Sequence, residues 1–416
     1  MILEFENIAY YTAAGFKKGK VTVSDGKVYL SPECDISKED VDGKIILPGL
    51  ADVHVHLREP GFFYKESIAT GSAAGARGGY TALLAMPNLN PVPDSTEHLA
   101  AELDAVRRTA KIGVYPYAAL TVGEKGKELS AIEELAPLVA GFSDDGKGVQ
   151  SAGLMREAMM RVKKCGSIIA AHCEDESLLD GGYIHDGAYA AAHGHKGISS
   201  ESEWKMVERD VALAAETGVK YHVCHVSTEE SVEIIRRAKA AGVDVTCETA
   251  PHYLTLTEND LEEDGRFKMN PPLRTVRDRD ALIEGLRDGT VDMIATDHAP
   301  HSDEEKSRGL RGSLMGVVGL EFAFPVLYTE LVKTGRISLM RLIAAMTTAP
   351  AKRFGLPTGD LYDGAPANLA VFDLSREWTV RGKECASKGS STPFEGRKVQ
   401  AKNTMTIYNG EIVWKE

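Results

Sequence analysis

Two histidines separated by a single residue, His54 and His56, give the strongest chemical signal in this sequence. Side chains two positions apart on a strand point to the same side, so the pair can present two imidazoles to one point in space. Val53, Val55 and Leu57 alternate with them, as in a strand that packs on both faces. The spacing is that of metal ligands, although alone it fits two core histidines of a buried strand equally well.

Later segments supply further candidate ligands, each at the end of a predicted strand. His172 and His225 end two strands, the pair Asp144-Asp145 ends another, and Asp297 ends the last. A single histidine is more often a satisfied core residue, and one of the two aspartates fits a turn position. Together, however, imidazoles and carboxylates from several strands describe a site for zinc or a similar divalent ion. Such an ion lowers the pKa of water enough to give a nucleophile near neutral pH, and two ions would share a bridging carboxylate.

These residues are positioned by a strand-then-helix alternation that repeats eight times between residues 50 and 364. The strand candidates are 50–57, 80–86, 112–120, 141–143, 167–173, 220–226, 244–249 and 292–296. Intervals of roughly 25 to 50 residues suit βα units joined by right-handed crossovers, so the sequence predicts an α/β fold, a (β/α)8 barrel of the TIM type. The carboxyl ends of barrel strands, where the candidate ligands stand, are where active sites are built.

The two ends of the chain read as short strands and turns. This pattern occurs at residues 21–23, 27–30, 43–49, 368–372 and 406–414. Neither flank alone is long enough to bury a core. We therefore expect residues 1–49 and 365–416 to form one small composite β domain beside a barrel domain of residues 50–364.

Two of the predicted helices have clear start signals. Asp94 with Glu97 predicts a capping box at one helix, and Ser227 with Glu230 predicts another. The second box places His225 just before a helix, at the carboxyl end of its strand. This position agrees with a role at the mouth of the barrel.

Two long polar segments are less regular. Residues 181–205 are rich in glycine and contain His185, His193 and His195, and we expect a loop over the pocket mouth rather than a second metal site. None of these three histidines shares the strand-end spacing of the other candidates. Residues 301–313 are predicted either as a lid that excludes water or as a disordered surface segment.

Composition excludes several classes of protein. The net charge of −13 argues against nucleic acid or an anionic membrane surface as the main partner. The first 14 residues lack the features of a signal peptide, and no run of about 18 apolar residues occurs, so we expect a cytoplasmic protein. The six cysteines form no CxxC pair and are expected to be reduced, with Cys173 and Cys224 as packing residues beside two candidate ligands.

The strand-end histidines and the motif Thr296-Asp297-His298-Ala299-Pro300 resemble the amidohydrolase superfamily. Within that superfamily, the chain is similar over essentially its whole length to the bacterial class I dihydroorotases. The motifs that carry this similarity are His56-Leu57-Arg58-Glu59-Pro60-Gly61, Met86-Pro87-Asn88, Asp144-Asp145-Gly146, Lys268-Met269-Asn270-Pro271-Pro272-Leu273-Arg274 and Asp297-His298-Ala299-Pro300-His301.

The resemblance implies a site for one or two zinc ions per chain. One ion would be bound by His54, His56 and Asp297, a second by His172 and His225, and Asp145 would bridge them. Many relatives bridge with a carboxylated lysine on the fourth strand. The corresponding stretch here, Gly141-Phe142-Ser143-Asp144-Asp145, contains no lysine, so the bridge is expected to be an aspartate, with the choice between Asp144 and Asp145 left open.

The resemblance also implies dihydroorotase activity, the reversible cyclisation of N-carbamoyl-L-aspartate to L-dihydroorotate in de novo pyrimidine (UMP) biosynthesis. Asp297 would take the proton of the attacking hydroxide and deliver it to the leaving nitrogen. Arg58, two residues past His56 on the same face, can hold the free substrate carboxylate with both ends of its guanidinium. Further substrate contacts are implied for Asn88, Asn270, His301, Met315 and Gly316.

Two alternatives remain at the level of sequence. A hydantoinase, dihydropyrimidinase or allantoinase opens similar rings that lack the free carboxylate, and Arg58 and the missing bridging lysine count against it. A non-catalytic dihydroorotase-like scaffold would typically lose metal ligands, whereas this chain retains the full set. A homodimer is the expected assembly, and aspartate transcarbamoylase is a candidate partner enzyme.

Overall fold

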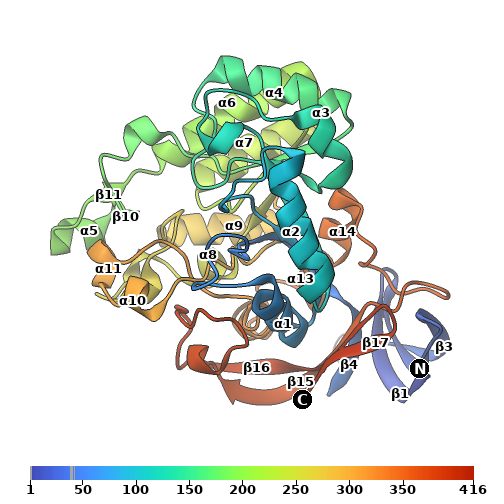
Figure 1. The fold of residues 1–416 in the computed structure, drawn as a ribbon. Coiled ribbons are helices and arrows are strands. Elements are labelled where there is room, and N and C mark those ends of the chain that lie inside the picture. Colours follow the sequence, from blue (N-terminus) through green and yellow to red (C-terminus); the bar gives the residue numbers. More distant parts are fainter. Residues whose placement is uncertain (1, 38–40, 42) are drawn as a thin grey trace.

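The computed structural model describes residues 2–37, 41 and 43–416. Figure 1 shows a barrel surrounded by helices, with a β-sheet from both ends of the chain at one side. The N- and C-termini both lie in that sheet. The barrel places the candidate ligands, and the sheet packs against its flank.

Eight parallel strands form the barrel in the order β14-β13-β12-β9-β8-β7-β6-β5. Their bounds are β5 Leu50–Val55, β6 Tyr80–Ala85, β7 Gly113–Ala119, β8 Gly141–Ser143, β9 Ile168–Ala171, β12 Lys220–Val223, β13 Val245–Thr249 and β14 Met293–Ile294. A parallel bridge between Val55 and His298, with a hydrogen bond from His56 N to His298 O (2.8 Å), joins the two end strands. The predicted (β/α)8 barrel is confirmed, and each predicted strand coincides with an observed one.

The first strand, β5, changes the side to which it presents its side chains. Ala51 and Val53 pack in the cluster that fills the barrel interior, whereas Val55 and Leu57 pack in the outer layer under the helices. The cause is a register shift against β6 midway along β5. Irregularities of this kind re-aim side chains next to active sites. Here the shift turns the histidine pair inward, above the filled interior.

Helices cover the outside of the barrel (Figure 1). The longer ones are α1 Ile68–Gly78, α2 Thr96–Thr109, α4 Ala152–Lys164, α6 Glu201–Thr217, α7 Glu229–Ala240, α9 Val276–Asp288 and α13 Leu339–Met346. The shorter ones are α3 Ile132–Leu135, α5 Ala188–His193, α8 Pro251–Thr255, α10 Asp303–Lys306, α11 Gly309–Gly312, α12 Ala323–Leu327 and α14 Thr348–Phe354. Among the described residues, no helix has both the length and the apolar character needed to cross a membrane.

The predicted capping boxes of two of these helices are wrong by one residue. Ser95, not Asp94, caps α2 by accepting a hydrogen bond from His98 N (3.3 Å). Asp94 does not cap the backbone, because its carboxylate accepts hydrogen bonds from Gly123 N (2.8 Å) in a distant loop and from the ring of His98 (2.7 Å) on α2. A side chain that binds a distant loop is not available to the backbone of its own helix.

The same displacement occurs at α7. Thr228, not Ser227, caps this helix by accepting from Ser231 N (3.3 Å). Ser227 instead donates its hydroxyl to the buried carboxylate of Glu203 on α6. Both helices begin close to the predicted positions, and His225 lies before α7 as predicted.

The ends of the chain form a seven-stranded sheet in the order β17-β16-β15-β4-β1-β2-β3. Its strands are β1 Leu3–Thr12, β2 Gly15–Ser24, β3 Lys27–Ile36, β4 Lys44–Pro48, β15 Leu369–Thr379, β16 Lys398–Tyr408 and β17 Glu411–Lys415. Gly49 links β4 directly to barrel strand β5, and a Cβ atom there would lie 2.1 Å from Thr81 Oγ1. The sheet combines both termini as expected, while the domain boundaries at residues 49/50 and 364/365 stay a prediction.

The connection between β15 and β16 reaches the rim of the barrel. Ser387 donates its hydroxyl to Glu66, and Lys388 N donates to the same carboxylate (3.3 Å). Glu66 is fully buried and in turn accepts from the ring of His298 (3.4 Å), the residue after Asp297. The composite sheet therefore supports the segment that carries the last candidate ligand.

The two long polar segments are folded. Residues 181–200 form an arm in which β10 Ile184–His185 and β11 Gly197–Ile198 flank α5, and it projects from the barrel in Figure 1. Residues 301–313 form α10 and α11 rather than an irregular surface segment. Buried Lys306 on α10 donates hydrogen bonds to Lys268 O (2.9 Å) and Leu314 O (2.8 Å). This lysine fastens the second segment to the barrel mouth.

Candidate metal centre and active site

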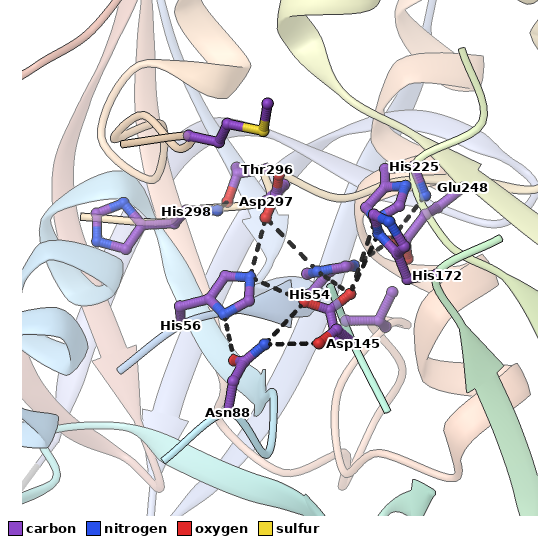
Figure 2. Close-up of polar contacts among 12 residues, drawn as sticks. His54, His56, Asn88, Asp145, His172, His225, Glu248, Thr296, Asp297 and His298 are labelled. Carbon is purple, nitrogen blue, oxygen red and sulfur yellow. Dashed lines mark hydrogen bonds and ion pairs between the residues drawn. The ribbon is translucent and has the colours of Figure 1, made fainter. Parts of the chain in front are cut away.

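Side chains from the carboxyl ends of the strands meet at the barrel mouth (Figure 2). His54 on β5 and His56, one residue beyond it, face Asp297, which follows β14. Asp297 Oδ1 lies 3.1 Å from His56 Nε2 and 3.5 Å from His54 Nε2. Asp145, two residues past β8, completes the group, with carboxylate oxygens 3.4 Å from His54 Nε2 and 3.5 Å from His56 Nε2.

A second group lies on the other side of the same carboxylate. His172 and His225 follow β9 and β12, and His172 Nδ1 is 2.9 Å from His225 Nε2. Asp145 Oδ1 lies 3.7 Å from that His225 nitrogen and 3.9 Å from that His172 nitrogen. Asp145 therefore stands between two clusters of nitrogen atoms, the position that a bridging ligand would take.

The neighbouring Asp144 points elsewhere. Its carboxylate accepts hydrogen bonds from Leu120 N (2.7 Å) and Thr121 N (3.0 Å), and from the Thr121 hydroxyl. These bonds hold the loop after β7. The geometry thus gives Asp144 the turn role that one of the two aspartates was expected to have, and supports Asp145 as the candidate bridge.

Three of the four histidines have one nitrogen held from outside the centre. His54 Nδ1 donates to Glu248 Oε1 (2.9 Å), and His56 Nδ1 donates to Asn88 Oδ1 (2.7 Å). His172 Nε2 donates to Glu174 Oε2 (3.3 Å). Because a ring nitrogen that donates carries the proton, the other nitrogen of each ring keeps its lone pair for an ion. In all three rings that nitrogen faces the centre.

The carboxylate of Glu248 is held by further hydrogen bonds on the side away from the centre. Its second oxygen accepts from His222 Nε2 (2.9 Å), and His222 Nδ1 lies 2.8 Å from Thr246 Oγ1. His225 N approaches the first oxygen at 3.4 Å. Although burial alone would raise the pKa of Glu248, the hydrogen bonds from His222 and His54 lower it to about 2. The carboxylate is therefore ionised and held rigidly beneath His54.

Two atoms that face the middle of the candidate metal centre have no hydrogen-bond partner among the described residues. They are His54 Nε2 and Asp145 Oδ1. Both are buried, and an unpaired buried polar atom costs about 1–3 kcal/mol. Burial alone would raise the pKa of Asp145, but His54 and His225 lower it well below its usual value. An ionised carboxylate and free imidazole lone pairs are the donor set that zinc prefers. The residues present therefore fit a divalent metal.

The backbone is strained at three of these strand ends. Arg58, His225 and Asp297 adopt positive φ angles of 59°, 33° and 47°. Such conformations cost a non-glycine residue on the order of 1–3 kcal/mol each and cluster at functional sites. They turn the chain sharply, so that side chains past the strand ends point back over the barrel mouth.

A pocket of about 210 Å³ opens onto the centre. It is lined by His56, Arg58, Asn88, Asp145, Gly146, His172, His225, Asn270, Asp297, Ala299, His301, Met315 and Gly316. Every predicted substrate residue is in this lining. The expectation of a loop over the pocket mouth at residues 181–205 is wrong, because residues 181–200 form the projecting arm, residues 201–205 begin α6, and none of them lines the pocket. A larger cavity of about 830 Å³ lies beside α13 and contains none of the candidate ligands.

Arg58 is placed to receive an anion. Its Nε donates to Pro300 O (3.3 Å), and among the described residues no carboxylate lies within ion-pair distance of its guanidinium. His301 stands nearby, with Nε2 2.7 Å from Met315 O and Nδ1 3.2 Å from Lys65 Nζ. Burial, and after it the charges of Arg58 and Lys65, lower the pKa of His301 to about 3. His301 is therefore neutral, and Arg58 is the cation that lines the pocket beside it.

Three residues of the site, Glu248, His222 and Glu174, were not predicted from the sequence. Glu248 and His222 lie within buried strands and so lack a strand-end position. A charged residue in an otherwise apolar strand was nevertheless a usable signal, because a buried carboxylate needs partners. Glu174, two residues after His172, repeats the spacing of the His54 and His56 pair.

Comparison with known proteins gives three results. Residues 43–231 match the family model described as dihydro-orotase-like. The chain is 51% identical over 379 residues to the dihydroorotase of Bacillus caldolyticus, covering 91% of this chain and 89% of that protein. It is 48% identical over 407 residues to the dihydroorotase of Geobacillus sp. (strain WCH70), covering 97% and 95%.

Solved structures agree on the fold. The L-hydantoinase from Arthrobacter aurescens superposes with a TM-score of 0.87 at 27% identity, covering 99% of this chain and 96% of that one. The dihydropyrimidinase from Brevibacillus agri superposes with a TM-score of 0.85 at 23% identity, covering 100% and 95%. The barrel with an attached terminal sheet is therefore an architecture that these enzymes share.

Proposed function

Because this chain belongs to the dihydroorotase family, we propose that it is a zinc-dependent enzyme that interconverts N-carbamoyl-L-aspartate and L-dihydroorotate. The observation that carries the activity is the 51% identity to a dihydroorotase across 91% of the chain. The enzyme class is that of a cyclic amide hydrolase with a small-molecule substrate. In cells, its place would be the ring-closing step of de novo pyrimidine (UMP) synthesis.

The candidate ligands fit one or two zinc ions. His54, His56 and Asp297 would hold one, His172 and His225 a second, and Asp145 would join them, an assignment supported by the distances among these groups. When bound, zinc supplies a nucleophile by lowering the pKa of water and stabilises the oxyanion that forms at the attacked carbonyl.

The remaining chemistry belongs to side chains. In ring opening, Asp297 accepts a proton from the attacking water or hydroxide and delivers it to the leaving ring nitrogen. The His56 and His54 rings lower the pKa of Asp297 even though burial would raise it, so it begins in the ionised form that a base requires. Arg58 holds the carboxylate that is not attacked, with both guanidinium ends on its two oxygens. Asn88, Asn270, His301, Met315 and Gly316 complete the substrate site.

Hydantoinase, dihydropyrimidinase or allantoinase activity is the second candidate. The solved neighbours include a hydantoinase and a dihydropyrimidinase, but at 27% and 23% identity, against 48–51% for the dihydroorotases. The rings that such enzymes open lack a free carboxylate. They would leave the guanidinium of Arg58 without a counter-charge, so the pocket favours dihydroorotate.

The test is ring opening of L-dihydroorotate by zinc-loaded protein, followed by ultraviolet absorbance, with hydantoin and allantoin as comparison substrates. We expect turnover of dihydroorotate alone. Preference for hydantoin or allantoin would replace the proposal with the second candidate. Purified protein that binds no divalent ion and turns over none of the three would point to a non-catalytic scaffold.

We further propose class I membership, supported by the aspartate of the Asp144-Asp145-Gly146 motif in place of a bridging lysine. A homodimer, association with aspartate transcarbamoylase and a cytoplasmic location are parts of the same proposal. Size-exclusion chromatography with light scattering, alone and with that enzyme, tests the assembly. A protein that is monomeric and does not bind the transcarbamoylase would contradict both the homodimer and the complex with that enzyme.

A further inference from the structure

One carboxylate oxygen connects the metal centre to the substrate pocket. Glu174 Oε2 accepts a hydrogen bond from His172 Nε2 (3.3 Å) and another from Asn270 Nδ2 (3.0 Å). Glu174 is only 8% exposed. His172, which follows β9, and Asn270, which lies between β13 and α9, thus share a single carboxylate acceptor.

The first effect is on His172. A carboxylate can only accept, so the nitrogen that faces Glu174 carries the proton. His172 Nδ1 then keeps its lone pair, and this nitrogen faces His225 Nε2 and Asp145 Oδ1. Carboxylate partners of this kind fix the orientation of a ligand ring and raise its basicity.

The second effect is on Asn270. Because Glu174 offers no proton, the amide of Asn270 must turn its NH2 group toward it, and Oδ1 points the other way. Asn270 Oδ1 has no hydrogen-bond partner among the described residues. Asn270 also lines the pocket. The side chain therefore keeps an unsatisfied acceptor, and the ureido N–H groups of the proposed substrate are donors that would satisfy it.

We propose that Glu174 is a positioning residue that couples zinc binding at His172 to substrate binding at Asn270. The inference rests on the proposed function for the identity of the substrate. The effect of Glu174 on zinc binding at His172 does not depend on that identity. Ordering His172 by an ion would also order the carboxylate that orients Asn270. Zinc loading and substrate affinity would consequently depend on each other through this one side chain.

Gln150 provides a matched control. Its side chain donates to the backbone carbonyl of Glu174 (3.0 Å) and accepts from Glu176 N (3.2 Å), but does not touch the Glu174 carboxylate. Gln150→Ala therefore loosens the same loop and leaves the proposed coupling in place. Glu174→Gln keeps the volume of the side chain and retains one acceptor oxygen, in case Glu174→Ala fails to fold.

The first experiment measures zinc affinity by competition with a chromophoric chelator. We expect Glu174→Ala to bind zinc about 10- to 100-fold more weakly, the usual cost of losing a ligand's outer partner. Glu174→Gln should lie between this variant and the unmodified protein. Asn270→Ala and Gln150→Ala should keep the affinity of the unmodified protein, because neither removes the partner of His172.

The second experiment measures KM for L-dihydroorotate at saturating zinc. Glu174→Ala and Asn270→Ala should each raise KM by about fivefold, the value of one ordinary hydrogen bond. In the double variant the two increases should not multiply, since Glu174 acts on the substrate only through Asn270. Gln150→Ala should leave KM unchanged.

Unchanged zinc affinity in both Glu174 variants, or KM increases that multiply in the double variant, would overturn the coupling. Failure of the unmodified protein to turn over dihydroorotate would instead reject the proposed function. The zinc titrations would still decide whether Glu174 positions His172, so the two failures can be told apart.

Discussion

At the scale of single residues, the centre is organised by groups that hold the ligands from outside. Glu248, Asn88 and Glu174 each bind the nitrogen that faces away from the centre in one histidine ring. The chemistry of each ring is thus determined by a neighbour that does not itself enter the centre. Through Glu248, this arrangement makes the metal site sensitive to a substitution that touches neither metal nor substrate.

Glu248→Gln tests this sensitivity. The amide can still accept from His54 but lacks the negative charge, so zinc affinity should fall by about tenfold. Chelator competition measures the change, with Thr246→Val at the far end of the His222 chain as the control. The three residues His54, Cys224 and Glu248 could also hold an ion themselves. A lower zinc content per chain in Cys224→Ala would contradict the assignment of Glu248 as a hydrogen-bond acceptor.

Arg58 is expected to determine which ring enters the pocket. Arg58→Ala should reduce kcat/KM for L-dihydroorotate on the order of 100-fold, because a charge-assisted pair of hydrogen bonds is lost. Arg58→Lys should recover little, since an ammonium cannot bind both carboxylate oxygens in the same fork. Steady-state kinetics with dihydroorotate provides the measurement. Full activity in Arg58→Ala would remove this residue from the substrate site.

The candidate ligands could be predicted from the sequence because they stand at strand ends with recognisable spacing. Glu248 and His222 could not be predicted in the same way, since their partners come from other strands and only the closed barrel brings them together. The choice between Asp144 and Asp145 also needed coordinates. Adjacent residues point in different directions, and nothing in their identity shows which one meets the histidines.

At the scale of elements, the barrel strands were predictable from their apolar runs, whereas helix starts were displaced by one residue. Each predicted cap residue instead forms a hydrogen bond with a residue distant in sequence, Asp94 with Gly123 and Ser227 with Glu203. Capping rules describe local competition for the first amides of a helix. They do not anticipate a side chain that is needed elsewhere.

Ser95→Ala should therefore destabilise the protein by about 1 kcal/mol, the typical cost of losing an N-cap. Glu97→Ala is the control, because the capping box in which it was predicted does not form. Urea unfolding of the two variants compares them. A larger loss for Glu97→Ala would contradict the observed cap.

Lys306 on α10 should make the free energy of unfolding depend on pH. Burial lowers the pKa of its ammonium to about 7 in the folded state. Between that value and an unfolded pKa of about 10.4, the unfolded chain binds the extra proton, so this group adds stability as pH rises and withdraws it as pH falls. The free energy of unfolding, compared with Lys306→Met, should rise by about 1.4 kcal/mol per pH unit in this window. If the free energy of unfolding changed with pH equally in the two proteins, Lys306 would not titrate in this pH window.

At the scale of the whole molecule, the candidate centre joins strands that are far apart in sequence. Its six candidate ligands come from five strand ends between residues 54 and 297. A bound ion would therefore tie together most of the barrel rim. This is why the fold and the site were predictable together, since one spacing pattern marks the strand ends and the ligands alike.

Removal of metal should consequently affect activity and stability together. Dialysis against a chelator should abolish turnover and lower the thermal midpoint by roughly 5 °C. This shift is the one expected when a chain of this length loses a ligand that was present at about 1,000 times its dissociation constant. Zinc should restore both. Calorimetry of the two forms makes the comparison, and identical midpoints would show that no structural ion had been removed.

The left-handed backbone at Arg58, His225 and Asp297 has a consequence for engineering. Glycine would relax each of these turns, because it reaches positive φ without a steric cost. Each glycine would also delete a group that the proposed reaction needs. At His225 and Asp297 the loss of a metal ligand would offset this gain, whereas Arg58 binds no ion. A random library screened only for heat tolerance should therefore enrich glycine at position 58 and yield stable proteins that no longer bind the substrate carboxylate.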